Sequence, residues 1–329
     1  MKTELKVIDG CQRSLRIEVD PEVVRQTNEN ILKGIEKSVQ IPGFRPGKAP
    51  HHLIKERYQE VINQKVMEKI IPEAYQKALE EHSLSPISEP VISEIEFTGD
   101  TLSYTVTFDV APEVKIDSYS GLSLEKKELE ITEEEVNRVL EEILKQNPRL
   151  QMEVRDIKVR EKVKAHLRER LEYQARLVAV QEEDGRIVEQ LLARAQVTPP
   201  LSLVKERTAE LVRHHLKGIT DFQTKTEEER KKVVEELFEK YKTQAEKEVK
   251  ASFVLEEIAR REKIEVSDSD VDRRIEIMAR VAGREKEAYA AEFDSERRER
   301  LKNQMRIEKT LNLLKKRALL VEKSGLIKV

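Results

Sequence analysis

The sequence has few of the residues on which several classes of protein depend. It has no tryptophan, one cysteine and 10 glycines in 329 residues, and aromatic residues make up 4%. The lone Cys11 excludes a disulfide framework and a cysteine metal cluster. No stretch of about 18 consecutive apolar residues occurs, which excludes a membrane-spanning helix. The composition therefore excludes three classes of protein: those held together by disulfides, those with a cysteine-ligated metal, and those with membrane-spanning helices.

The N-terminal residues lack the pattern of a secretory signal peptide. Glu4 and Asp9 lie where such a peptide needs an apolar centre. We therefore expect the protein to remain in the cytoplasm, without a membrane partner.

Charged residues are the most abundant feature. They make up 38% of the chain, against about a quarter in an average soluble protein. Basic and acidic residues nearly cancel, 61 against 64, so any contact with nucleic acid would need a local basic patch. Many charges with few turn residues predict long amphipathic helices, and the length leaves room for two or three domains.

Residues 1–115 predict a compact α+β domain. Leu15, Ile17 and Val19 alternate with charged residues, as in a half-buried strand. Asp20-Pro21 then predicts the start of a helix, and a second helix is expected from about residue 59 to 82, with a bend at Pro72. The segments 91–98 and 101–110 flank Gly99-Asp100 and predict a hairpin with one buried face.

Beyond this domain the chain predicts a linker and then helices. Residues 116–131 are expected to be extended, and Thr132 with Glu135 forms a capping-box pattern before a helix that ends near Pro148. Residues 151–329 show helical periodicity almost throughout, with a break at Pro199-Pro200. We divide the chain into residues 1–115, a linker with a connecting helix at 116–150, and a helical domain at 151–329.

One short segment is dense in turn residues. Residues 41–50, Ile-Pro-Gly-Phe-Arg-Pro-Gly-Lys-Ala-Pro, contain two glycines and three prolines, so they cannot continue a helix. Residues 33–57 hold six Lys or Arg against two Glu, a local charge of +4 in an acidic chain. An aromatic side chain, Phe44, lies between these cations. The segment suits docking on a surface that combines an apolar pocket with acidic groups or phosphate.

Residues 41–50 have two other interpretations, an ordinary turn and a phosphate-binding loop. An ordinary interhelical turn with a solvated charged rim explains the composition about as well from physics alone. A phosphate-binding P-loop does not, because Gly43-x-x-x-Gly47-Lys48 is one residue too short and Ala49 replaces the Ser or Thr that binds magnesium. The docking loop and the plain turn both remain open at this point.

Other motifs are weak. His51-His52 and His214-His215 are adjacent pairs without a spaced carboxylate set, so they are expected to be solvated surface residues and not metal ligands. Residues 297–317 hold nine Lys or Arg against two Glu, a net +7. This segment could contact RNA or balance acidic helices packed nearby, and we favour the second interpretation. We expect no catalytic residues, no metal site and no cofactor.

At the loop the sequence resembles a known family. Residues 43–50, Gly-Phe-Arg-Pro-Gly-Lys-Ala-Pro, are similar to the G-F-R-x-G-K-x-P signature of trigger factor, the bacterial ribosome-associated chaperone. The surrounding order of strand, helix, loop, helix and hairpin is similar too. The resemblance is strong over residues 1–147 and looser over 151–329. It implies an α+β N-terminal ribosome-docking domain followed by a mainly α-helical chaperone domain with extended arms.

The resemblance also implies partners and site residues. The loop would dock beside the nascent-chain exit of the large ribosomal subunit, on a ribosomal protein and rRNA, while the helical domain would hold unfolded nascent polypeptides. A homodimer is a further implication. In the loop, Phe44, Arg45 and Lys48 would make the contacts, and the loop would be shaped by Gly43, Pro46, Gly47 and Pro50.

The chain departs from the family in one large respect. Typical members carry an inserted prolyl isomerase domain that is rich in β-strands. Here Lys145–Leu150 passes almost directly into helical pattern, and the interval between Pro148 and Pro199 has one aromatic residue, Tyr173. We therefore expect a chaperone that lacks this domain and is not an enzyme.

The surface that binds unfolded chains is the least defined part of the prediction. Apolar residues of the long helices could line a groove of low sequence specificity, or could simply form core between helices, which is the better interpretation residue by residue. The candidates are Val249, Phe253, Leu255, Ile258, Met278, Val281, Met305 and Leu314. The alternative function is a helical structural or RNA-binding protein that uses the basic loop and the basic C-terminal helix.

Overall fold

The computed structural model describes residues 1–38, 51–126, 131–148, 152, 154, 156–219 and 221–322. The chain divides into two compact units. The first combines Met1–Glu113 with Thr198–Val249, and the second combines Val114–Val197 with Lys250–Val329. Each unit is described separately.

The N-terminal part of the first unit is a four-stranded antiparallel sheet. Its strands are β1 (Lys2–Val7), β2 (Gln12–Val19), β3 (Val91–Phe97) and β4 (Leu102–Asp109), in the order β1-β2-β4-β3. The register places Ile17 opposite Tyr104, so the alternating apolar residues of β2 and β4 share one face. The predicted strand and hairpin are confirmed, whereas β1 was not predicted because its side chains are mostly exposed.

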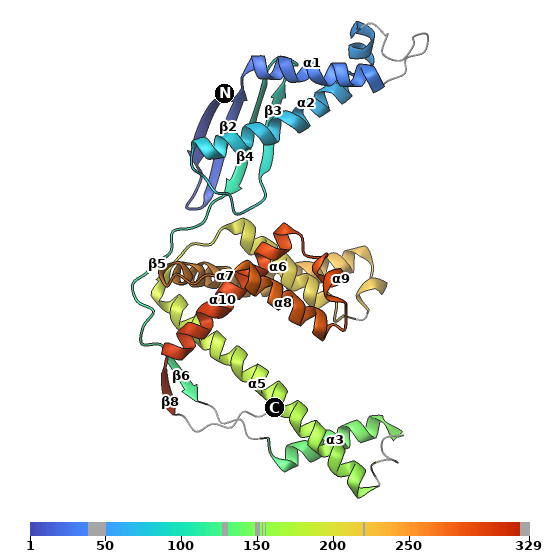
Figure 1. Ribbon diagram of the computed structural model, residues 1–329, viewed down its shortest axis with the longest axis vertical. Coiled ribbons are helices and arrows are strands. Elements are labelled where there is room, and N and C mark those ends of the chain that lie inside the picture. Colours follow the sequence, from blue (N-terminus) through green and yellow to red (C-terminus); the bar gives the residue numbers. More distant parts are fainter. Residues whose placement is uncertain are drawn as a thin grey trace. The chain divides into compact units, whose positions relative to one another are not determined.

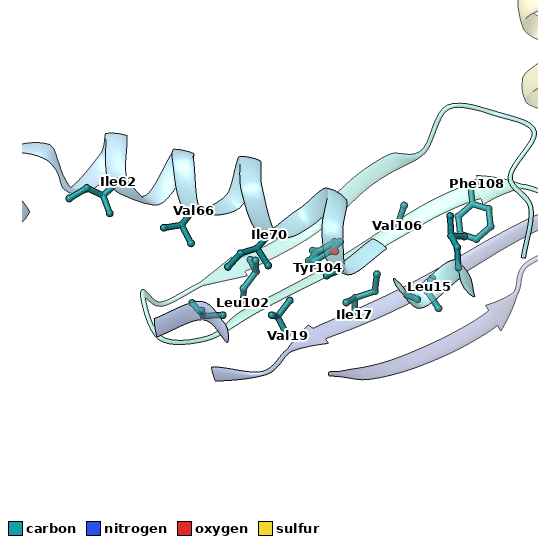
Figure 2. Packing of buried hydrophobic residues seen from close by; sticks show 14 of the residues in the cluster. Leu15, Ile17, Val19, Ile62, Val66, Ile70, Leu102, Tyr104, Val106 and Phe108 are labelled. Carbon is teal, nitrogen blue, oxygen red and sulfur yellow. The ribbon is translucent and has the colours of Figure 1, made fainter. Parts of the chain in front are cut away.

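Two helices, α1 (Pro21–Ser38) and α2 (His51–Glu81), accompany this sheet (Figure 1). The start of α1 is confirmed, since the Asp20 carboxylate accepts a hydrogen bond from the backbone N–H of Glu22 at 3.0 Å. Figure 2 shows the apolar face of α2 above the sheet, where Ile62, Val66 and Ile70 meet the side chains of β2 and β4. These buried contacts form the core of the N-terminal part.

Helix α2 contains both Pro72 and a kink. The helix continues through the proline, and the kink lies at Tyr58, whose φ of −121° and ψ of 20° are not helical. Buried residues lie on both sides of the proline, including Ile70 and Ala74. Packing of these residues against the sheet keeps α2 helical despite the backbone hydrogen bond that proline cannot make.

The segment expected to be an extended linker is packed into the second unit. Strand β5 (Lys115–Ile116) pairs with β7 (Ala195–Gln196), and β6 (Ser123–Lys126) pairs in parallel with β8 (Leu319–Glu322). Ile116, Leu122 and Leu124 are buried in a core shared with helices from distant parts of the chain. Residues 114–126 are therefore structural and do not act as a free tether.

Two helices follow as an antiparallel hairpin. Helix α3 (Glu133–Gln146) starts with the predicted capping box between Thr132 and Glu135. Helix α5 (Ile157–Arg194) is continuous through Gly185, and only residues 147–156 separate it from α3. Leu167 and Leu171 of α5 pack on Val136 and Leu140 of α3.

The remaining helices complete both units. They are α6 (Leu201–Leu216), the short η1 (Phe222–Thr224), α7 (Glu227–Arg261), α8 (Asp268–Val281), α9 (Lys286–Ala290) and α10 (Ser295–Arg317). In the second unit one core joins Ile187, Ile258 and Leu314, and another joins Ile275 to Leu301. An α+β N-terminal part followed by a mainly helical region confirms the predicted fold class.

Candidate functional site

The turn-rich loop connects α1 to α2. Its signature residues, 43–50, lie outside the described residues. Ile35 near the end of α1 and Ile54 near the start of α2 are 5% and 1% exposed and belong to the same core as the buried residues of the sheet. The structure thus anchors both helices close to the points where the loop begins and ends.

The basic residues around the loop face solvent where the structure describes them. Lys33 on α1 and Lys55 and Arg57 on α2 are exposed. The unusual backbone of Tyr58 follows directly after Arg57. The loop is therefore flanked by exposed cations on two helices that are held by a buried core.

Half of the candidate groove residues are core residues. Val249, Leu255, Ile258 and Leu314 are between 0% and 8% exposed. The last three pack together in one core of the second unit. These four side chains are not available in this structure to bind an unfolded chain, because helical periodicity identifies an apolar face but not the helix that covers it.

The other candidates lie closer to the surface. Phe253 is half-buried, and Met278 and Met305 are partly buried against the core formed by α8 and α10. Val281 is 84% exposed, and Ile277, which was not among the candidates, is 48% exposed. Ile277 and Val281 lie one turn apart on α8 and form a small apolar patch at the end of that helix.

The basic helix α10 is neutralised by acidic neighbours. Lys302 pairs with Asp268 and Lys309 with Asp270, both at 2.9 Å, and Arg298 pairs with Asp272. The bond from Lys302 lowers the pKa of Asp268, and the bond from Lys309 lowers the pKa of Asp270. The prediction that this segment balances acidic helices is confirmed, and α10 does not present a free cationic face.

A group of two ion pairs on α7 lies beside strand β5, with Glu257 mostly buried and both arginines partly exposed. Glu257 contacts Arg260 and Arg261 at 2.8 Å, and Arg261 also donates to the carbonyl oxygen of Ile116 at 2.9 Å. The hydrogen bond from Arg260, followed by that from Arg261, lowers the pKa of Glu257 from 4.5 to about 2. Glu257 therefore remains ionised at neutral pH and orients Arg261 toward β5.

The described residues show no site for a metal ion. No group of three His, Cys, Asp or Glu among them is close enough to hold one. The Nδ1 atom of His215 and the hydroxyl of Tyr241 form a hydrogen bond of 2.9 Å. The side chains of His51 and His52 lie outside the described part of the structure. Cys11 is buried and free. No described helix is long and apolar enough to cross a membrane.

Comparisons with protein families cover most of the chain. The family model described as bacterial trigger factor protein (TF) matches residues 1–143, and the model described as bacterial trigger factor protein (TF) C-terminus matches residues 161–316. The two matches are separated only by residues 144–160, which comprise the end of α3, the short connection and the start of α5.

Comparisons with individual proteins agree with this result. The chain is 38% identical to the trigger factor of Natranaerobius thermophilus over 149 residues, and 38% identical to that of Bdellovibrio bacteriovorus over 147 residues. It spans about a third of the length of each of these curated relatives, because the matches cover 33% of both.

A longer match extends over nearly the whole chain. The trigger factor of Koribacter versatilis is 22% identical over 417 aligned residues, which cover 94% of this chain and 95% of that protein. Since the alignment is longer than the 329 residues of this chain, the relative contains additional residues without a counterpart here. A solved structure from work on promiscuous substrate recognition by the trigger factor chaperone has the same fold, with a TM-score of 0.56, 16% identity and coverage of 95% of this chain and 99% of that one.

Proposed function

Since the chain belongs to the bacterial trigger factor family, we propose that it is an ATP-independent chaperone that docks on the large ribosomal subunit near the nascent-chain exit and shields unfolded polypeptides. The observation that carries the proposal is the match of the two family models, in order, to the sheet-and-helix part and the helical part. The cytoplasm is the compartment in which this function would operate.

Docking is assigned to the loop between α1 and α2. Phe44, Arg45 and Lys48 would contact a ribosomal protein and rRNA, while Gly43, Pro46, Gly47 and Pro50 would set the loop's shape. The exposed Lys33, Lys55 and Arg57 extend the cationic surface around it and would strengthen attraction to phosphate. In this proposal residues 1–115 form the docking domain, 116–150 the connection and 151–329 the domain that binds clients.

Client binding is assigned to the less buried apolar residues of the helical domain. The patch of Ile277 and Val281 is exposed. Phe253, Met278 and Met305 are partly buried. Small exposed apolar patches bind unfolded segments weakly and with little sequence preference. A homodimer is part of the proposal and depends on the family alone.

The first test is suppression of aggregation without nucleotide. We expect the protein to keep a chemically unfolded substrate soluble at equimolar ratio, measured by light scattering. Replacing Ile277 and Val281 by Ser should weaken substrate affinity roughly fivefold, because about 1 kcal/mol of apolar contact is lost. Val23→Ser with Val61→Ser, two residues that are 46% and 43% exposed on α1 and α2, is the matched control. No suppression by the wild type would contradict the proposal.

We also propose that the chain has no prolyl isomerase activity. In support, only residues 147–156 lie between α3 and α5, which is too short for a folded domain. In a protease-coupled isomerisation assay, the rate of cis-to-trans conversion of a proline peptide should equal the uncatalysed rate, which is slow. Any acceleration proportional to protein concentration that persists after further purification would overturn this part.

A further inference from the structure

Helix α5 carries a row of basic residues beside the face that packs on α3. Lys158, Lys162, His166 and Arg170 are spaced four residues apart, so they lie above one another on the helix surface, and all four are exposed. We call these four residues the α5 ridge. The side of α5 that packs on α3 carries Leu167 and Leu171 instead, so the ridge takes no part in the core of the hairpin.

The ridge is electrostatically unbalanced, in contrast to α10. Residues 157–170 hold six Lys or Arg against two Glu, a net +4 with His166 neutral. Among the described residues, the side chains of Lys158, Lys162 and Arg170 form no ion pair, whereas α10 is matched by carboxylates of α8. Exposed cations that lack an ion pair within the described part of the chain are therefore grouped on α5, although α10 is the more basic helix.

Helix stability does not explain the first residue of the ridge, Lys158. The positive end of the helix dipole lies at the N-terminus, where acidic side chains are favourable and basic ones are not. The first turn of α5 contains Lys158 and Arg160 and no acidic residue. Asp156 caps the helix, but Lys158 itself forms no ion pair among the described residues, so a ligand that carries negative charge would relieve an unfavourable position.

An exposed aromatic residue continues the ridge. Tyr173 is 63% exposed and lies one turn beyond Arg170. The two residues border a shallow hollow of about 700 Å³ that is also lined by His166, Glu169, Glu172 and Arg176. Glu172 pairs with Arg176, whereas Arg170 forms no ion pair among the described residues and lines the same hollow as Tyr173. Cations with an exposed ring match the requirements of single-stranded nucleic acid, whose phosphates are bound by charge and whose bases stack on aromatic rings.

We propose that the α5 ridge together with Tyr173 is a second docking surface that binds a single-stranded or looped segment of RNA. Successive ridge residues are about 6 Å apart along the helix axis, a spacing comparable to that of consecutive phosphates in a strand. The inference deepens the proposed function, since ribosomal RNA is the RNA that a chaperone docked at the ribosome would meet. It supplements the loop and does not replace it.

The test measures RNA binding directly, in a protein whose loop no longer contributes. The parent is the full chain with Phe44, Arg45 and Lys48 replaced by Ala, and the probe is a short fluorescein-labelled oligoadenylate followed by anisotropy. Adding Lys158→Gln, Lys162→Gln and Arg170→Gln should weaken binding at least about tenfold at low salt. The slope of log affinity against log salt should fall by about 2, as expected for three lost phosphate contacts to a single strand. Tyr173→Ala should weaken binding roughly tenfold.

A matched variant controls for charge and folding. Lys231→Gln, Lys232→Gln and Lys242→Gln remove the same charge from exposed positions of α7 and should leave RNA affinity unchanged. Gln is a good helix former, so both variants should retain helicity by circular dichroism. Lys158→Arg with Lys162→Arg should preserve binding. Failure of the parent to bind RNA, or equal weakening by the α7 control, would overturn the proposal.

Two comparisons separate this inference from its alternatives. If polyglutamate of equal charge displaces the probe as well as unlabelled RNA does, the ridge recognises acidic polypeptide and the assignment to RNA is wrong. With an intact loop, the ridge variant should still sediment with ribosomes, at several-fold lower affinity. Absence of ribosome binding by the wild type would refute the proposed function. The oligoadenylate assay would still show whether the α5 ridge binds RNA.

Discussion

Replacing Phe44, Arg45 and Lys48 by Ala is expected to reduce ribosome binding roughly 100-fold. An aromatic anchor at the centre of an interface is worth about 2 kcal/mol, and the two cations at its border add about 1 kcal/mol together. The loss therefore corresponds to about 3 kcal/mol. Co-sedimentation with purified ribosomes over a range of protein concentrations measures it.

The helices that carry this loop should remain folded in the variant. Ile35 and Ile54 hold α1 and α2 in the core independently of residues 43–50, so circular dichroism should be unchanged. The α7 variant with Lys231, Lys232 and Lys242 replaced by Gln serves as the charge control and should sediment as the wild type does. Unchanged sedimentation of the loop variant would remove the main support for docking through this segment and would favour the interpretation as an ordinary turn.

The second large effect is expected from a single core residue of the sheet. Tyr104 is 1% exposed, lies between β4 and α2 (Figure 2), and donates its hydroxyl proton to the carbonyl oxygen of Ile71 at 3.0 Å. Burial raises the pKa of its hydroxyl above the ordinary range, so the group stays protonated as a donor. Tyr104→Ala removes the ring and should lower the free energy of unfolding by about 3 to 5 kcal/mol.

Tyr104→Phe separates the hydroxyl from the ring. It keeps the buried ring and loses one hydrogen bond, so it should cost about 1 kcal/mol. Hydrogen exchange of the β2 and β4 amides reports the local free energy of opening and avoids assuming a two-state transition for the whole chain. Tyr173→Ala, at an exposed position, should leave this protection within about 0.5 kcal/mol. Equal costs for the two Tyr104 variants would show that packing of the ring is not the main contribution.

The sequence predicted best where the signal is local. Alternation in β2 and β4 and the Asp20 and Thr132 caps depend on neighbouring residues and agree with the structure. Such features are fixed within a few residues, so tertiary packing seldom overrides them.

The sequence predicted poorly where a partner from a distant segment decides the outcome. Strands β5 and β6 have no local signal, because each is short and exists through pairing with β7 or β8. Leu255 and Ile258 could be groove or core until the helices that cover them are known. The same applies to charge: α10 has the larger excess of cations, but only the structure shows that acidic residues of α8 pair with three of them. Among the described residues, the α5 ridge forms no ion pair.

The parallel pair of β6 and β8 has a consequence for how the protein itself is made. Synthesis delivers residues in order, so β6 emerges long before Leu319–Glu322, its hydrogen-bonded partner. The four strands of the N-terminal sheet lie within residues 2–109 and can pair while the remainder is still being translated. The sheet beneath α1 and α2 is thus free to mature early, whereas closure of β6 on β8 must await the last part of translation. We expect the newly made chain to acquire its N-terminal sheet before the fold of the second unit is complete.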